Sequence, residues 1–511
     1  MLRALAIAAT GLLLAGCASE ERHATAVKPP VVVLVLDEFP TDSLLTPSGE
    51  IDAARYPNFA ALARMSTWFP NAYTVFDSTF KAVPAILDGV MPADGTAADQ
   101  RSHNANVYRL MHRHGYGVVD VESASALCPQ NVCPGSRIRR PGVLARLAGP
   151  GRPPRLHRWI GAIRRRGRPT FYFQHALLPH SPWIYLPSGR AMRSPGEEPI
   201  KNAHRWPSFD DAGLTRHNEL RHLLQVGFVD HELGLLLRRL RQTRLLRKSL
   251  LVVVAYHGQS FDVGVQSRRR ATDANVEEIA PVPFFVKLPH QAAGRRDPAS
   301  VRNLDVVATK ADVLNVRVPW RQDGHSAFSR IESERQVIEL PKRDCDGIVT
   351  ISAKELARRR ARRRAHRARI FGTGLQSVRR YGDPWAAAYR IGPNRSILGR
   401  RTSPLTSGFA VVRAEVHSPG LVRRLPRAGR SQVVPTLVTG ELTGDLPGGE
   451  RDLALAVNGR IAAVGRSFQL VRPEHEYFSL LMPENALRAG VNRLELFEVR
   501  DGRTLAPIAG R

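Results

Sequence analysis

Residues 77–89 read Asp77-Ser78-Thr79-Phe80-Lys81-Ala82-Val83-Pro84-Ala85-Ile86-Leu87-Asp88-Gly89. Hydroxyl side chains open this stretch, a lysine follows them, and an apolar run with helical character ends in a glycine. Hydroxyls in the first turn of a helix often cap backbone N–H groups that have no partner. The same position also exposes a hydroxyl beside N–H donors that bind an anion readily. The stretch alone favours capping, but the motifs found elsewhere in the chain strengthen the catalytic interpretation.

The clearest strand pattern lies upstream, where Val31 to Leu36 form an unbroken run of valine and leucine. Such a run is typical of a strand that is buried on both faces of a parallel sheet. It ends in Asp37 and Glu38. Open α/β sheets bind their ligands beyond the carboxyl ends of the strands, so both acids are candidate site residues. Solvated loop acids are the alternative interpretation.

Strand and helix patterns alternate over roughly the next 300 residues, which predicts a doubly wound α/β domain. We assign residues 31–340 to this domain. The expected helices cover 56–65, 107–114 and 215–241, and the further strands cover 118–121, 170–176, 250–255 and 283–287.

The pattern changes after Phe328. Residues 356–369 form an arginine–alanine run with high helix propensity and no apolar stripe, so we expect a basic linker over 341–402 with an exposed helix. Such a helix could lie on anionic headgroups or be a solvated connector, and most charge runs are solvated. Short β-patterned runs between turns over 403–511 predict a β-sandwich of roughly 100 residues.

Residues 1–16 have the features of a signal peptide, because a short basic start precedes an apolar run too short to span a bilayer. The ending Leu14-Ala15-Gly16-Cys17 resembles the bacterial lipoprotein signal. It implies lipidation of Cys17 and a tether over 17–30, and an ordinary secretory signal is the alternative. No later run is apolar enough to span a bilayer. We expect an exported protein, either a cell-membrane lipoprotein facing outside the cytoplasm or a secreted protein.

Three further cysteines fit an oxidising compartment. Cys128 and Cys133 are close enough in sequence to close a small disulfide loop. A zinc site is the alternative, but no second Cys/His pair lies nearby in sequence, so we expect the disulfide. Cys345 is left over and is expected to be unpaired.

The formal net charge is +29, and arginines spread along the whole chain supply almost all of it. Such a charge favours anionic partners. An exported protein rarely meets nucleic acid, so we expect no nucleic-acid partner. The expected partners are an anionic ester substrate, an envelope glycan or lipid headgroup, and the membrane through a lipid anchor.

With these pieces in order, the chain from Val31 to about Phe328 resembles the sulfatase-like branch of the alkaline phosphatase superfamily. That family has a first strand that ends in acids, seen here as Asp37-Glu38. Its nucleophile lies about ten residues before a helix-ending glycine, and counting back from Gly89 gives Thr79. The loop Pro179-His180-Ser181-Pro182 and the segment 303–326 match later family motifs.

The chain departs from the family in two places. Type I sulfatases carry Cys or Ser within Cys-x-Pro-x-Arg, and neither the residue nor its context is present around Thr79. A threonine looks more like the phosphatase, phosphodiesterase and transferase branches, whose threonine attacks phosphorus directly. The family's late strand ends in Asp-His-Gly, whereas this chain has Tyr256-His257-Gly258.

The chemistry expected of such a site needs an activated hydroxyl, because threonine is a poor nucleophile at neutral pH. A divalent cation would lower the pKa of the hydroxyl. The resemblance implies metal binding by Asp37, Glu38, Thr79 and His257, with Zn²⁺, Mn²⁺, Mg²⁺ or Ca²⁺ as the ion. A phenol at position 256 is a poor ligand for these ions at neutral pH.

Two further side chains are predicted to bind substrate, and these are His180 and Lys81, whereas His175 is expected to be a buried strand residue. Two functional hypotheses follow. The first is an exported metal-dependent hydrolase or transferase acting on sulfate or phosphate esters, with Thr79 as nucleophile. The second is a catalytically degenerate family member that binds an anionic envelope polymer, and Tyr256 favours it.

Overall fold

The computed structural model describes residues 28–122, 125, 127–134, 151–194, 200, 203, 210–265, 267–329, 336–342, 347–425, 432–444, 449–470 and 475–510. The predictions for the signal peptide, Cys17 and Cys345 lie outside these residues. Within them, no helix combines the length and the apolar character that a bilayer crossing requires.

A seven-stranded sheet forms the centre of the larger domain, in the order β3-β4-β1-β5-β6-β2-β7. The first four of these are parallel, and β6 runs antiparallel to β5. Its strands are β1 (Val31–Leu36), β2 (Thr67–Trp68), β3 (Gly117–Val121), β4 (Thr170–Ala176), β5 (Leu250–Ala255), β6 (Phe284–Lys287) and β7 (Arg295–Arg296).

Helices cover both faces of this sheet, as the predicted doubly wound fold requires. Alternate residues of β1 point to opposite faces. Leu34 and Leu36 pack into a core with α1 (Pro57–Ala63), α5 (Arg152–Ala162) and α6 (Ala212–Gln242). Val33 and Val35 pack into a second core with α2 (Thr79–Asp88), α3 (Val107–Arg113) and α8 (Val306–Val313).

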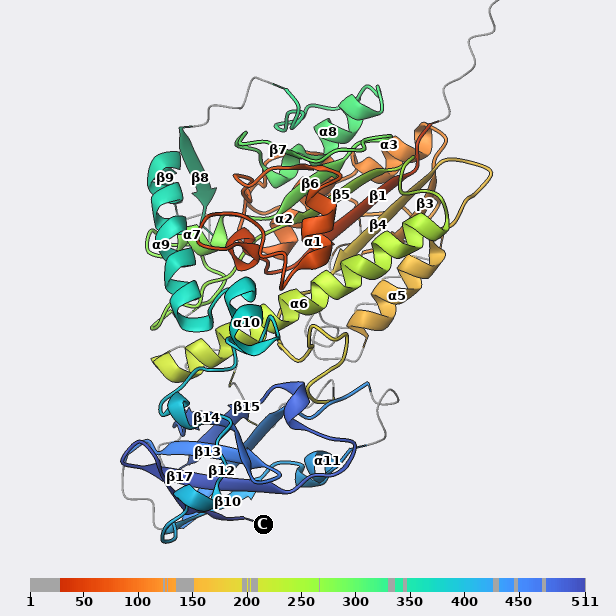
Figure 1. The fold of residues 1–511 in the computed structure, drawn as a ribbon. Coiled ribbons are helices and arrows are strands. Elements are labelled where there is room, and N and C mark those ends of the chain that lie inside the picture. The colour runs from red at the N-terminus through yellow and green to blue at the C-terminus, as the bar shows by residue number, and fades with distance from the viewer. Residues whose placement is uncertain are drawn as a thin grey trace, which may run out of the picture.

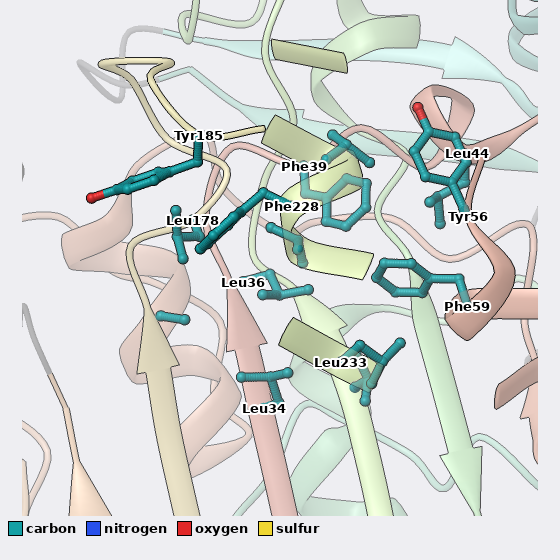
Figure 2. Close-up of a cluster of buried hydrophobic side chains, with 14 of the residues drawn as sticks. Leu34, Leu36, Phe39, Leu44, Tyr56, Phe59, Leu178, Tyr185, Phe228 and Leu233 are labelled. Atoms are coloured by element: carbon teal, nitrogen blue, oxygen red, sulfur yellow. The ribbon is translucent and has the colours of Figure 1, made fainter. Parts of the chain in front are cut away.

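Figure 2 shows the first of these cores, where Leu34 and Leu36 face the side chains of Phe228, Leu233 and Phe59. Figure 1 shows α6 running diagonally across the sheet on this side. The long helix runs from the carboxyl ends of the strands toward their first residues, so Gln225 reaches the loop that leaves β4 and Arg239 reaches Ile163 before β4.

The smaller domain is a β-sandwich, which confirms the second part of the predicted fold class. One sheet has the order β15-β12-β10-β19 and the other β14-β13-β17-β18. It lies below the α/β domain in Figure 1. The strands are β10 (Val412–Val416), β12 (Leu437–Gly444), β13 (Asp452–Val457), β14 (Arg460–Arg466), β15 (Glu476–Leu481), β17 (Leu494–Arg500), β18 (Thr504–Pro507) and β19 (Ala509–Gly510), with β11 (Arg424–Leu425) and β16 (Gly490–Val491) paired beside them.

The arginine–alanine run is helical but is not the solvated connector that its sequence suggested. Between the two domains lie the hairpin β8 (Val337–Pro341) and β9 (Ile348–Ser352), then α9 (Ala353–Phe371) and α10 (Gly374–Tyr381). One face of α9 is held against the α/β domain by arginines that pair with acids of distant segments. The pairs are Arg360–Asp42, Arg364–Asp42, Arg363–Glu278 and Arg367–Glu219. Specific charge pairing therefore fixes this helix in place, which periodicity alone could not reveal.

Candidate active site

The two acids after β1 lie at the carboxyl edge of the sheet, where the sequence predicted a site. Asp37 and Glu38 are only 1% and 0% exposed. The backbone N–H of Asp37 donates to the carbonyl of Leu178 at 2.9 Å, and that of Phe39 donates to the carbonyl of His257 at 2.9 Å. The loops that follow β1, β4 and β5 are thereby tied together. Glu38 has a φ of 53°, a left-handed conformation that a non-glycine residue adopts at a cost.

His180 is brought to these acids by the loop after β4. Its Nε2 lies 3.1 Å from Glu38 Oε1, and the ligand atoms of Asp37, Glu38 and His180 lie within 4.8 Å of one another. The side chain of Gln225 on α6 holds this loop, because its Nε2 donates to the carbonyls of Pro179 at 2.9 Å and His180 at 2.8 Å. An acid–imidazole cluster thus forms from two separate strand ends.

Thr79 is the first residue of α2, and its hydroxyl does not cap the helix. The N-cap residue, Ser78, makes no side-chain cap hydrogen bond either. The Thr79 hydroxyl instead lies 3.0 Å from the phenol oxygen of Tyr256. The capping interpretation of the opening stretch is therefore not the one that the structure shows.

Tyr256 lies between the hydroxyl and the acid pair. Its fully buried phenol oxygen is 3.0 Å from the Thr79 hydroxyl, and Asp37 is near enough to affect the pKa of the phenol. Burial and the neighbouring Asp37 raise the pKa of Tyr256 well above its ordinary value, so the phenol stays protonated at neutral pH. Its backbone is also fixed, because the carbonyl of Tyr256 accepts hydrogen bonds from Asn303 Nδ2 at 3.0 Å and from the hydroxyl of Thr74. The residue that departs from the family motif thus hydrogen-bonds the Thr79 hydroxyl beside the acid pair.

The two acids differ in their electrostatic surroundings. Burial and the charge of Glu38 raise the pKa of Asp37 to about 7. Burial also opposes ionisation of Glu38, but Arg268, His180 and Arg269 together lower its pKa below the ordinary value. Arg268 Nη2 lies 3.1 Å and Arg269 Nε 3.5 Å from Glu38 Oε1. Glu38 is therefore the ionised member of the pair.

Two guanidinium groups at this position were missed by the sequence reasoning. Arg268 also donates from Nη2 to the hydroxyl of Ser181 at 2.7 Å, so it links the loops after β4 and β5. The available signal was the run Arg268-Arg269-Arg270, which stands within the loop that follows β5. Arginine in such a loop suits recognition of an oxyanion.

The other predicted site residues do not all lie beside the acid pair. His257 donates from Nδ1 to the carbonyl of Gly258 at 2.8 Å and is among the groups that lower the pKa of Glu38. Lys81 points elsewhere, because its ammonium donates to the carbonyl of Thr96 at 3.1 Å and to its hydroxyl at 3.2 Å. His175 is buried and pairs through Nδ1 with Glu122 at 2.6 Å. The structure therefore joins His180 to the acid pair and leaves Lys81 outside that cluster.

The structure also contains the predicted disulfide and the motif that closes the larger domain. Cys128 and Cys133 are joined by a disulfide. At the end of η3 (Asn303–Asp305), the carboxylate of Asp305 accepts from the backbone N–H groups of Arg302 at 2.7 Å and His325 at 3.1 Å. The backbone N–H of Asp323 donates to the carbonyl of Gly89 at 2.9 Å. This motif thus anchors the glycine end of α2.

Buried acids, an imidazole and a hydroxyl beyond the carboxyl ends of parallel strands define an α/β protein built to bind a charged ligand. A family model described as Sulfatase matches residues 29–316, which is more than half of the chain. The chain therefore belongs to the sulfatase family, and the resemblance to the sulfatase-like branch of the alkaline phosphatase superfamily is confirmed. Members of this superfamily are metal-dependent, and the family supports hydrolysis of a sulfate or phosphate ester.

Several solved structures are similar to this chain. A 2-O glycosaminoglycan sulfatase is 15% identical, with 62% of this chain and 78% of that chain covered and a TM-score of 0.44. A phosphonate monoester hydrolase from Agrobacterium radiobacter is 15% identical, with coverage of 65% and 82% and a TM-score of 0.40. The corresponding hydrolase from Silicibacter pomeroyi is 16% identical, with coverage of 61% and 79% and a TM-score of 0.38.

Proposed function

We propose that this protein cleaves a sulfate or phosphate ester, with the Thr79 hydroxyl as the attacking group and a divalent cation at Asp37 and Glu38. One observation carries the proposal. The hydroxyl of Thr79 is directed to Tyr256 at 3.0 Å, and the neighbouring Asp37 helps to raise the pKa of that phenol.

The side chains present fit a divalent cation. Asp37 Oδ1 is buried and has no hydrogen-bond partner among the described residues, which is a costly state for a carboxylate oxygen. It lies in the cluster with Glu38 and His180. Carboxylate and imidazole donors together suit Zn²⁺ or Mn²⁺. Such an ion would offset negative charge on the ester and lower the pKa of the attacking hydroxyl.

The residues of the chain can orient the hydroxyl and accept its proton. When Asp37 is ionised, it accepts the phenol hydrogen of Tyr256, so the phenol oxygen is left to accept the hydrogen of Thr79. As Thr79 Oγ1 forms its bond to sulfur or phosphorus, its hydrogen passes to the Tyr256 oxygen and the phenol hydrogen passes to Asp37. The bond to the ester's alcohol breaks in the same exchange, and the alcohol oxygen leaves with that electron pair and takes a proton from solvent water. Water or another alcohol would then attack the sulfur or phosphorus and displace the Thr79 oxygen. Attack by water gives hydrolysis, and attack by another alcohol gives transfer.

A second candidate function is favoured by the arginines around Glu38. Arg268 and Arg269 already bring positive charge to this carboxylate, at 3.1 and 3.5 Å. A catalytically degenerate protein could use these guanidinium groups to hold an anionic envelope polymer without a cation and without cleavage. The absence of a family carboxylate at Tyr256 agrees with this alternative.

Divalent-metal binding separates the two candidates. We expect the natural protein to bind Zn²⁺ or Mn²⁺ in titration calorimetry, and Asp37→Asn to weaken the affinity at least about tenfold, or ~1.4 kcal/mol. Asp37→Asn keeps the side-chain volume, so its melting temperature is the control for folding. Cleavage of 4-nitrophenyl sulfate and of 4-nitrophenyl phosphate should be measured on both proteins. A natural protein that binds neither metal and cleaves neither ester would leave the binding function as the better account.

We also propose that the protein is exported and anchored through lipid on Cys17, as the sequence of residues 14–17 suggests. Cys17→Ser should then release the protein from the membrane fraction of the expressing cell at high salt, because the acyl chains are its main attachment. Immunoblotting of the membrane and soluble fractions measures this. Complete retention of Cys17→Ser in salt-washed membranes would contradict the lipid anchor.

A further inference from the structure

The strands of the α/β domain place two very different sets of loops at their two edges. β1, β3, β4 and β5 are parallel, so their first residues share one edge, and the last residue of antiparallel β6 lies there too. We call this the amino edge. It is formed by residues 28–30, 112–116, 163–169, 243–249 and 288–294, and the candidate active site lies at the opposite edge. Figure 1 shows the strand starts at the upper right, away from the β-sandwich.

The amino edge is strongly cationic. Its five segments contain no aspartate or glutamate. Every lysine and arginine in them is exposed, and none forms an ion pair within the described part of the chain. These residues are Lys28, Arg113, Arg164, Arg165, Arg166, Arg168, Arg244, Arg247 and Lys248. The acids gather at the other end of the same strands, in Asp37, Glu38, Asp42 and Glu122. The amino edge therefore carries positive charge that no acid of its own segments offsets, in addition to the basic surface of α9.

A cavity on this edge has the chemistry of an anion site. It has a volume of about 530 Å³ and lies between the end of α6 and the turn that follows β6. Its cationic lining is Arg241, Arg244, Arg247 and Lys248, His290 is also part of the lining, and its apolar lining includes Met65 and Leu246. The buried ammonium of Lys287 is used within the fold, because it donates to the carbonyls of Arg247 at 3.0 Å and Leu288 at 2.9 Å. The exposed cations around the cavity remain available to a ligand.

The chain enters the domain at this same edge. The backbone N–H of Leu250 donates to the carbonyl of Pro30 at 3.0 Å, immediately after Lys248 and Ser249. Tyr116 donates to the carbonyl of Pro29 at 3.1 Å, and the Lys28 ammonium donates to the carbonyl of His114 at 3.0 Å. Any attachment of the preceding residues to a membrane would therefore bring the amino edge to that membrane first.

We propose that the amino edge is a docking face for a membrane surface that carries anionic phospholipid headgroups, with a headgroup phosphate seated in the cavity. Clustered Lys and Arg near a negatively charged leaflet are attracted to it strongly, and the attraction falls within a Debye length. Docking in this way directs the opposite edge, with Thr79 and Glu38, away from the membrane. The proposal concerns a separate face and is independent of the proposed function.

Vesicle sedimentation tests it on the full chain carrying Cys17→Ser, so that no acyl chain contributes. We expect binding to phosphatidylcholine vesicles that contain phosphatidylglycerol, little binding to phosphatidylcholine alone, and loss of binding as salt is raised. The triple variant Arg244→Gln, Arg247→Gln, Lys248→Gln should bind at least about tenfold more weakly. Because these side chains are exposed, the variant should melt within a few degrees of the natural protein.

The matched control removes the same charge from another basic surface. Arg358, Arg362 and Arg369 are exposed on α9, and their triple change to glutamine should leave vesicle binding within about twofold. An equal loss in this control would show that net charge, and not the amino edge, governs binding, and would overturn the proposal. Failure of the Cys17→Ser protein to bind the anionic vesicles would also overturn it, even if the protein bound a sulfated polysaccharide.

Discussion

Replacing Thr79 with alanine should abolish ester cleavage and leave the protein folded. The change removes the only oxygen of that side chain, so no bond to sulfur or phosphorus can form there, and turnover should fall at least ~10³-fold. The stability cost is the hydrogen bond between the Thr79 hydroxyl and Tyr256, about 1 kcal/mol. The melting temperature should therefore drop by only about 2–4 °C. Steady-state cleavage of the better of the two nitrophenyl esters and thermal unfolding measure both effects.

Two conservative substitutions distinguish the role of the Thr79 hydroxyl from that of the Tyr256 phenol that orients it. Thr79→Ser keeps a hydroxyl at the same place and should retain measurable turnover. Tyr256→Phe keeps the Thr79 hydroxyl but removes its hydrogen-bond partner, so turnover should fall by an intermediate factor of about 10²–10⁴. If Thr79→Ala turned over as fast as the natural protein, the nucleophile assignment would be wrong and another group would have to attack.

Replacing Arg360 with alanine should destabilise the protein by about 1.5–3 kcal/mol, because it removes two charge-assisted hydrogen bonds to buried Asp42 and leaves only Arg364, among the described residues, paired with that carboxylate. Arg360 Nε and Nη2 lie 2.9 and 3.1 Å from the two oxygens of Asp42, and Nη1 donates to the carbonyl of Pro70 at 3.1 Å. Both side chains are less than 10% exposed. Denaturant unfolding followed by circular dichroism measures the difference.

The neighbouring Arg362→Ala is the matched control. Arg362 is exposed and lies 3.9 Å from a partly exposed glutamate, so its loss should change stability by less than about 0.5 kcal/mol. If Arg360→Ala lost equally little stability, α9 would be only a solvated connector, as its sequence had suggested.

The same pair predicts a pH dependence. Burial opposes ionisation of Asp42, but Arg360 and Arg364 lower its pKa below the ordinary value. A carboxyl whose pKa is lower in the folded state stabilises the fold fully above its unfolded pKa, about 3.9, and loses that contribution as the pH falls through the folded value. The stability gap between the natural protein and Arg360→Ala should therefore narrow below about pH 4. Unfolding curves collected at pH 7 and near pH 3 test this.

Much of the fold could be predicted because its signals are local. The run from Val31 to Leu36 is apolar at every position, as a strand buried on both faces must be, and it forms β1. The acids placed at its end lie in the candidate site. Patterns at 170–176 and 250–255 became β4 and β5 with the same bounds. The β-sandwich was also recognisable, because short alternating runs between turns require a partner sheet to bury one face.

The candidate site was predicted less completely, because its parts meet only through the fold. Asp37 and Glu38 were predicted from their position at a strand end, and Thr79 was predicted from the resemblance to the family, by its distance from Gly89. Arg268 was missed, since its partner Glu38 is 230 residues away and no periodicity connects them. Lys81 was placed by its proximity in sequence to Thr79, but side chains two residues apart on a helix do not face the same way.

The sequence by itself determined the alternation of the main strands and helices of the larger domain, the acids at the end of the first strand, and the position of the hydroxyl at the start of α2. These follow from hydrophobic period, chain direction and turn residues, which act over a few neighbouring positions. Only the tertiary structure decided what those polar groups contact. The Thr79 hydroxyl turned to Tyr256, 177 residues away, and Arg360 turned to Asp42, 318 residues away. A buried polar group must find its partner wherever the packed elements bring one, so its pairing depends on the whole fold and cannot be read from its neighbours.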